Sequence, residues 1–414
     1  MVPEKSGLED VVAHGTMVAG VIASNGKIRG VAPNVAITPY KVFDGFECDS
    51  TWVIDAIIEA ANDKMDVVNI SLGSYKSLIK EEETAVYESY LRAIDYARSN
   101  GCILVASAGT ENNGYDISDP EKLAEQRGEI GDKQVHIPGG LEDVITVSAA
   151  NRDEKLPFYS NYGYNIDFAA PSGDYGPAWE IEGYIDLSYL LLTTYPTNLE
   201  QTELSIYFGF DKGYEFNAGG TSLAAPKVTA TVALIIAKYK EKYGVKPTEQ
   251  TVIQLLKEGA TNIDNKLQFG NGIINAKNSL NKLIEQTNVT EQANTYEPIN
   301  IFVPYNTIEV DDPFVYVDEI AVVDPSVNLN KIEETNKSDV YILVVREGKD
   351  GRNIANTLKK EFPDTNFLYK KEINVITFKY KDVDTLNDIK NYINENLKTT
   401  IKRMGKSSRL LLKQ

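Results

Sequence analysis

The sequence predicts an α/β fold in which helices cover both faces of a parallel sheet, followed by a small α+β domain. Over residues 18–288, short apolar runs alternate with stretches of helical spacing. This alternation is typical of strands that are buried on both faces of a parallel sheet. Beyond residue 287 the alternation stops, and residues 331–414 carry 18 basic and 12 acidic side chains in a chain of net charge -18. The change in composition indicates a second domain.

The first part of the chain contains four predicted strands and three predicted helices. The strands are residues 36–38, 67–70, 103–106 and 144–147, and the helices are residues 51–63, 82–99 and 223–243. The third helix is apolar on nearly all sides at its start, which predicts that it runs through the core. Residues 111–139 and 173–213 interrupt the pattern and are predicted to be surface insertions.

The last part of the chain has its own order of elements. We predict a strand at 341–345, a helix at 351–362, two strands within 366–380, a helix at 384–397 and a further strand beginning at 399. This βαββα(β) order is that of a small α+β sandwich. The predicted domains are 1–287, a linker or irregular segment 288–337, and 338–414, which ends in a solvated basic tail from residue 402.

Composition excludes several classes of protein. With 42% hydrophobic and 25% charged residues among 414, the chain can bury a large core, which rules out collagen and a largely disordered protein. No apolar run approaches the roughly 18–20 residues of a membrane span, and the negative charge argues against a nucleic-acid partner. Cys48 and Cys102 are too few for a disulfide framework and leave the redox compartment open.

Two motifs carry the residues of nucleophilic catalysis. His14 begins HGTMVAG, residues 14–20, and Ser222 lies within GGTSLAAP, residues 219–226. Each stands at a predicted helix start, where backbone N–H groups without intrahelical partners suit a developing oxyanion. A histidine can take the serine proton and return it to the leaving amine, and His136 is the only other histidine. Each motif alone is also typical of a cap or turn, but the pair within a parallel α/β pattern favours catalysis.

With these motifs, the sequence resembles the subtilisin family of serine peptidases from about residue 7 to residue 283, and residues 30–42, 158–171 and 270–276 add to the likeness. The resemblance implies peptide hydrolysis through an acyl-enzyme, with Ser222 as nucleophile and His14 as general base. It also implies that two segments align the substrate and wall the S1 pocket, which receives the residue before the scissile bond (P1). Their residues are Ser71, Leu72, Gly73, Ser107, Ala108 and Gly109. Residues 191–196, 213–214 and 221–228 are most similar to lantibiotic leader peptidases.

The first departure from the family is the aspartate of the catalytic triad. The family carries it some thirty residues before the histidine, in an Asp-Ser/Thr-Gly context that this sequence lacks. Asp10 occupies the position of an acidic residue beside the S2 subsite, and it is a weaker candidate for the triad. We expect that the segment with the aspartate, and any secretion signal and propeptide, are missing from this chain. Loss of that carboxylate costs roughly four orders of magnitude in turnover.

The second departure is Thr110, which stands where the family has an oxyanion-hole asparagine. With the backbone N–H of Ser222, its hydroxyl is the predicted oxyanion hole, and Asn112 and Asn113 are alternative donors. In a subtilisin, loss of this asparagine costs roughly two to three orders of magnitude in turnover. The loop 24–29 is short compared with family members that hold calcium tightly, so we predict no calcium site and no cofactor.

The sequence therefore predicts a serine endopeptidase acting on a peptide or protein, with leader processing of a lantibiotic-type peptide as the finer hypothesis. The alternative is a catalytically impaired protein that acts as a peptide-binding or regulatory protein, because the triad aspartate is absent. Residues 338–404 are similar in element order to the family's inhibitory propeptide, which favours the hypothesis that their net positive charge lets them cap an acidic cleft of the catalytic domain as an inhibitor or folding aid. The alternative, which we prefer, is a common small sandwich with a structural role or the remains of a neighbouring gene. The resemblance favours an extracellular or cell-surface location.

Overall fold

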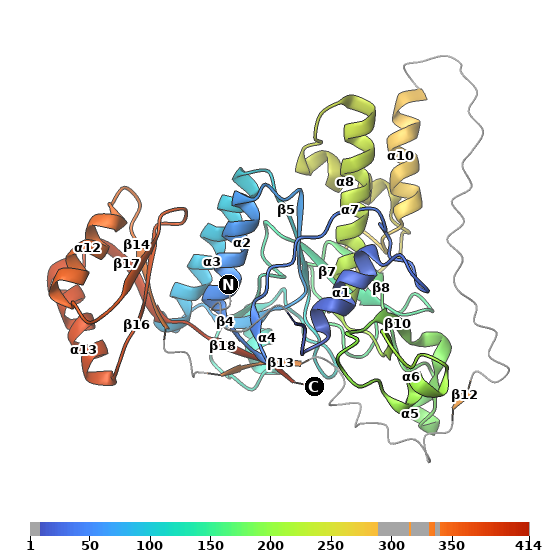
Figure 1. The fold of residues 1–414 in the computed structure, drawn as a ribbon, viewed down its shortest axis with the longest axis horizontal. Coiled ribbons are helices and arrows are strands. Elements are labelled where there is room, and N and C mark those ends of the chain that lie inside the picture. The colour runs from blue at the N-terminus through green and yellow to red at the C-terminus, as the bar shows by residue number, and fades with distance from the viewer. Residues whose placement is uncertain (1–8, 289–313, 316–330, 336–339, 414) are drawn as a thin grey trace.

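A four-stranded parallel sheet forms the centre of the computed structural model, which describes residues 9–288, 314–315, 331–335 and 340–413 (Figure 1). Its strands are β3 (Val67–Ile70), β5 (Ile103–Ser107), β7 (Ile145–Ala150) and β8 (Phe168–Pro171), in that spatial order. All of β5 and β7 is buried. The predicted α/β class is confirmed.

Helices cover both faces of this sheet. Alternate residues of β5 face opposite sides, so that Leu104 joins the core beneath α2 (Ser50–Asn62) and α3 (Glu81–Ser99). Val105 joins the core beneath α7 (Thr221–Tyr243) and α8 (Glu249–Gly259). The helices α1 (His14–Ala23) and α10 (Ala276–Asn288) also pack against α7.

Among the described residues, α7 is long and apolar enough to cross a membrane by length and composition. It packs against all four strands of the parallel sheet, and 67% of its most apolar window is buried inside the protein. The core of the fold therefore accounts for its apolar character, as the sequence predicted.

The predicted strand at 36–38 is wrong. These residues form no regular structure, and Ile37 is 41% exposed. A strand needs a neighbour for its backbone N–H and C=O groups, and no strand in the described part of the chain pairs with this segment.

The two predicted insertions contain short elements. The first holds α4 (Pro120–Gln126) and β6 (Gln134–Ile137), which pairs with β4 (Ser74–Ser77). The second holds α5 (Trp179–Glu182), β9 (Ile185–Asp186), β10 (Leu191–Thr194) and α6 (Glu203–Tyr207). Strand β10 pairs with β11 (Tyr214–Asn217), and β9 pairs with β12 (Phe314–Val315). A short helix, α9 (Lys266–Phe269), precedes α10.

The C-terminal residues form a separate antiparallel sheet in the order β15-β16-β14-β17. Its strands are β14 (Val340–Val345), β15 (Phe367–Lys370), β16 (Val375–Lys379) and β17 (Ile401–Lys406). The helices α12 (Gly351–Glu361) and α13 (Val383–Tyr392), with a π-helical turn at Ile393–Leu397, cover one face. The order β-α-β-β-α-β agrees with the sequence prediction.

The other face of this sheet packs on the larger, N-terminal part of the chain. Ile342 and Val344 of β14 share one core with residues of α2 and α3, and the capping of an acidic cleft by this part of the chain stays a prediction. Figure 1 shows α3 lying between this sheet and the central sheet. The chain then continues as β18 (Arg409–Lys413), which pairs with β2 (Glu47–Asp49) and β13 (Lys331–Thr335). Strand β2 also pairs with β1 (Phe43–Asp44).

The predicted solvated tail from residue 402 is therefore wrong, because residues 401–406 and 409–413 form two strands. The predicted boundaries of the linker fall mostly outside the described residues and remain a prediction.

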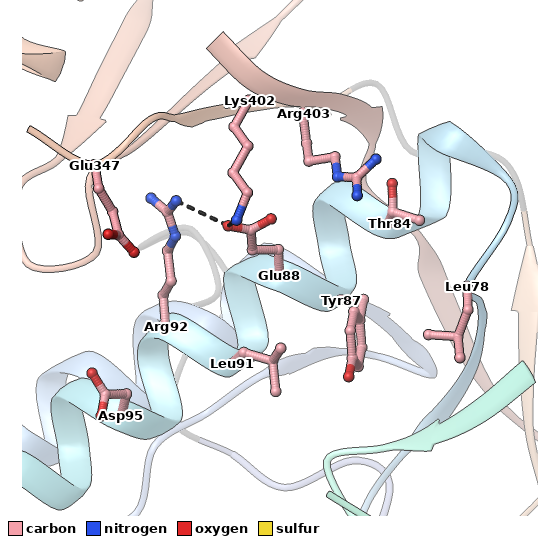
Figure 2. Close-up of a pocket in the computed structure, with 10 residues that line it drawn as sticks. All are labelled: Leu78, Thr84, Tyr87, Glu88, Leu91, Arg92, Asp95, Glu347, Lys402 and Arg403. Atoms are coloured by element: carbon pink, nitrogen blue, oxygen red, sulfur yellow. Dashed lines mark hydrogen bonds and ion pairs between the residues drawn. The ribbon is translucent and has the colours of Figure 1, made fainter. Parts of the chain in front are cut away.

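Polar contacts reinforce this docking. The guanidinium group of Arg92 on α3 donates hydrogen bonds to the carbonyl oxygens of Val345, Ile373 and Asn374 at 3.0–3.2 Å. The carboxylate of Glu88 forms ion pairs with Arg92, at 2.9 Å, and with Lys402, at 2.6 Å. Figure 2 shows these three side chains converging along a cavity of about 370 Å³.

Candidate active site

Helix α1 presents His14 as its first residue. The carboxylate of Asp10 accepts hydrogen bonds from the backbone N–H groups of Val12, Ala13 and Thr16 at 2.8–3.0 Å and from the Thr16 hydroxyl at 2.6 Å. These donors are the groups that a helix start leaves without partners. Together they hold the pKa of Asp10 below its usual value, although its burial acts in the opposite direction. Asp10 thus fixes the backbone that carries His14, and its predicted contact with substrate remains a prediction.

Helix α7 presents Ser222 as its second residue, after two glycines. Gly219 and Gly220 have φ angles of 101° and 137°, which a residue with a side chain rarely adopts. A Cβ atom on Gly219 would also lie 2.4 Å from the carbonyl oxygen of Gly173. This tight turn aims the start of α7, and the backbone N–H of Ser222 has no acceptor within the helix.

The two helix starts come together in the fold. Helix α1 packs on α7, and the neighbours of the two reactive residues, Ala13 and Leu223, lie in one apolar cluster. His14 is 7% exposed, and its Nε2 atom is buried without a hydrogen-bond partner in the part of the chain that the structure describes. Burial lowers the pKa of His14 to about 4, with a smaller opposing effect of the Asp10 charge. The imidazole is therefore neutral at pH 7, as a general base must be.

Among the described residues, His14 lacks the hydrogen bond that orients the histidine of a catalytic triad. Among residues 9–288 and 340–413, no carboxylate hydrogen-bonds to either ring nitrogen of His14. Asp10 acts on the imidazole through its charge, and its two oxygens are taken up by the helix start. In a triad, a carboxylate on Nδ1 selects the tautomer and stabilises the imidazolium.

Thr110 lies beside the nucleophile. Its Oγ1 accepts a hydrogen bond from the backbone N–H of Thr221 at 3.1 Å and lies 3.1 Å from the Thr221 hydroxyl. The Thr221 hydroxyl in turn accepts from the N–H of Gly109 at 3.1 Å. The hydroxyl of Thr110 can therefore donate next to the Ser222 N–H, while the alternative donor Asn113 lies in a turn with φ 71°.

The two predicted substrate-aligning segments are tied to the same helix start. Ser71 donates from Oγ to the carbonyl oxygen of Ser222 at 2.7 Å. The Asn69 amide donates to Ser71 at 2.9 Å and accepts from the Thr229 hydroxyl of α7 at 2.9 Å. A polar chain thus fixes the end of β3 against the first three turns of α7.

Sequence reasoning missed part of this network. It assigned no role to Asn69, Thr221 or Thr229, because these polar residues meet only through the packing of β3 and β5 on α7. The signal was present in their position, since Asn69 lies in the predicted strand 67–70 that leads into segment 71–73, and Thr221 directly precedes Ser222. In the described part of the chain, no group of three or more His, Cys, Asp or Glu side chains could hold a metal ion.

Comparison with known proteins decides the family. The sequence model of the Subtilase family matches residues 3–273. This range includes His14, Ser222 and the two predicted substrate-aligning segments. The chain belongs to the subtilase family. The predicted subtilisin-like fold is thereby confirmed.

Relatives of this subtilase include leader-processing enzymes. It is 33% identical over 285 residues to the epidermin leader peptide-processing serine protease of Staphylococcus epidermidis, which covers 64% of this chain and 57% of the relative. It is 31% identical over 290 residues to the nisin leader peptide-processing serine protease of Lactococcus lactis subsp. lactis, which covers 66% of this chain and 39% of the relative. This chain thus spans less than two thirds of those two proteins.

A solved structure extends the likeness to three dimensions. The crystal structure of a lanthipeptide protease aligns with a TM-score of 0.58 and 33% identity, over 66% of this chain and 76% of that chain. The two leader-processing relatives are serine proteases, in agreement with the predicted class of enzyme.

Proposed function

We propose that this subtilase hydrolyses peptide bonds through an acyl-enzyme formed on Ser222. The observation that carries the proposal is the packing of α1 on α7, because the first residues of these two helices include His14, with a buried and neutral imidazole, and the partly exposed Ser222. A free backbone N–H and a threonine hydroxyl stand beside that serine. These are the parts that acyl transfer needs.

The steps follow from the positions of these groups. Ser222 Oγ attacks the carbonyl carbon while His14 accepts its proton. The Ser222 N–H and the Thr110 hydroxyl stabilise the oxyanion. His14 then protonates the leaving amine, and the acyl-enzyme forms. A water molecule, deprotonated by the same imidazole, releases the acid and restores Ser222.

The proposed substrate is the leader segment of a lantibiotic-type precursor peptide. Two relatives at 31–33% identity are named as leader peptide-processing proteases, and the similar solved structure is that of a lanthipeptide protease. A peptide partner agrees with the open ends of the segments at 71–73 and 107–109, where Gly73 and Gly109 are partly exposed. We expect an extracellular or cell-surface location, as for a protease that acts on an exported peptide.

A second candidate function is peptide binding without turnover. It is favoured by the absence, in the described residues, of a carboxylate hydrogen-bonded to His14. Such a protein would retain the aligning segments and would act as a peptide-binding or regulatory protein.

Incubation of the purified chain with a lanthipeptide precursor, followed by mass spectrometry, separates the two candidates. We expect cleavage at one bond between leader and core by the unaltered chain and none by Ser222→Ala. If neither protein cleaves and both bind the precursor with equal affinity, the second candidate replaces the first.

A further inference from the structure

The second histidine lies against the two segments that are predicted to line the S1 pocket. His136, on β6, is 3% exposed, and its Nε2 atom faces the two glycines of the aligning segments. A Cβ atom built on Gly73 would lie 2.5 Å from His136 Nε2, and one built on Gly109 would lie 3.0 Å from it. The imidazole edge therefore contacts the Cα atoms of both glycines and spans the gap between the two segments.

The ring is held firmly in this place. His136 Nδ1 lies 2.8 Å from the carbonyl oxygen of Gly139, and because a carbonyl can only accept, Nδ1 carries the proton and Nε2 is an acceptor. The ring of Tyr75 packs at 5.0 Å between centroids. Burial lowers the pKa of His136 to about 4. The hydrogen bond to Gly139 acts in the opposite direction, and the charge of Arg127 adds to the lowering. The ring is thus neutral at physiological pH.

The layer around the ring is closely packed. Asn161 donates to the Tyr75 hydroxyl at 2.8 Å and to the Ala108 carbonyl at 2.9 Å, and its amide would lie 2.4 Å from a Cβ on Gly109. Arg127 stacks over the Tyr75 ring at 3.7 Å, and the negative charge of Glu111 acts on the same tyrosine. The opposite charges of Arg127 and Glu111 thus both act at Tyr75, whose ring packs against His136.

We propose that His136 forms the floor of the S1 pocket and restricts P1 to small, uncharged side chains such as Gly, Ala or Ser. This inference rests on the proposed function, because S1 exists only if the segments at 71–73 and 107–109 align a substrate. A P1 side chain that enters between Gly73 and Gly109 meets the imidazole edge at the level of their Cα atoms. A large side chain has no space there, whereas a serine hydroxyl can donate to Nε2.

The test compares two peptides that differ only in Ala or Phe at P1. Their affinities are measured by fluorescence anisotropy on a Ser222→Ala background, so that the result does not depend on turnover. We expect the Ala peptide to bind at least tenfold more tightly than the Phe peptide, since a misfit of even one methylene in a pocket shifts selectivity about 10–200-fold. His136→Gly should remove or reverse this ratio by opening space for the phenyl ring.

His136→Gln is the matched control, since it keeps a side chain of similar length and should keep the preference for Ala. Melting curves of each variant establish that it is folded, and His136→Ala replaces His136→Gly if the latter is not. Tighter binding of the Phe peptide by the unaltered pocket, or an unchanged ratio in His136→Gly and His136→Ala, overturns the proposal. Cleavage of the precursor by the chain with Ser222 intact is measured separately. If this cleavage is absent, the ratio of the two peptide affinities still tests the role of His136.

Discussion

The hydroxyl of Ser71 donates a hydrogen bond of 2.7 Å to the backbone carbonyl of Ser222. This bond joins the residue that follows β3 to the nucleophile at the start of α7, and Asn69 and then Thr229 extend the link beyond Ser71. The end of the strand and the start of the helix therefore move as one unit, so the spacing between the substrate-aligning segment and the nucleophile is fixed by polar contacts as well as by packing.

Ser71→Ala should lower kcat/KM about tenfold, because small displacements of a nucleophile are costly. It should also lower the free energy of unfolding by about 1 kcal/mol, the usual net value of one hydrogen bond. Ser148→Ala is the matched control, since Ser148 is also buried and donates from Oγ to a backbone carbonyl, that of Gln268, at 2.6 Å. It should lose similar stability and keep its kcat/KM. Equal kcat/KM values for the two variants would argue against a positioning role for Ser71.

Thr110 offers a test of the oxyanion hole. Thr110→Val keeps the shape but removes the hydroxyl, and it should lower kcat by about tenfold or more with little change in KM. Thr110→Ser keeps the hydroxyl and should retain most of the activity. Thr110→Asn supplies an amide donor and should raise kcat. Steady-state kinetics with one peptide substrate checks all three, and an active Thr110→Val would show that Thr110 is not part of the oxyanion hole.

The charge of Asp10 should influence how the labelling rate of Ser222 depends on pH. The pKa of His14 lies near 4 in the folded chain, so the acid limb of the Ser222 labelling rate should fall near pH 4, well below the ordinary value of about 6.5. Asp10 raises this pKa, so Asp10→Asn should move the limb to lower pH. Asparagine can still cap the helix.

The reagent for this measurement is a small fluorophosphonate, which places no side chain in S2. Asp119 caps α4 through the N–H groups of Glu121 and Lys122, and Asp119→Asn should leave the limb unchanged. A limb at pH 6.5 in the unaltered chain, or a shift to higher pH in Asp10→Asn, would contradict the assignment.

Gly405 tests the docking of the C-terminal sheet. A Cβ atom there would lie 1.9 Å from the Glu82 carbonyl oxygen on α3, so Gly405→Ala must push β17 away from the helix. We expect a loss of about 1–3 kcal/mol in the free energy of unfolding. Gly348→Ala has open space around it and should cost only the strain of its φ of 71°, about 1 kcal/mol. Urea denaturation compares the two, and a smaller loss for Gly405→Ala would mean that this contact is not tight.

Sequence patterns were sufficient for the parts of the fold that depend on local periodicity. The apolar runs at 67–70 and 103–106 and the long apolar helix after Ser222 lie where they were expected. The run at 36–38 failed because a strand also needs a neighbour, and residues 401–406 and 409–413 form strands because they pair with β14 and β2. The place of His136 could not be read from the sequence, since it depends on the pairing of β6 with β4 across an insertion.

The proposed catalysis depends on the pairing of His14 with Ser222. The most direct measurement is the rate at which a fluorophosphonate labels Ser222, located by mass spectrometry, in the unaltered chain and in His14→Ala at pH 7. The account predicts labelling confined to Ser222 and a rate at least a hundredfold lower in His14→Ala, as expected for loss of a general base. Equal rates in the two proteins, or no labelling of Ser222 in either, would contradict it.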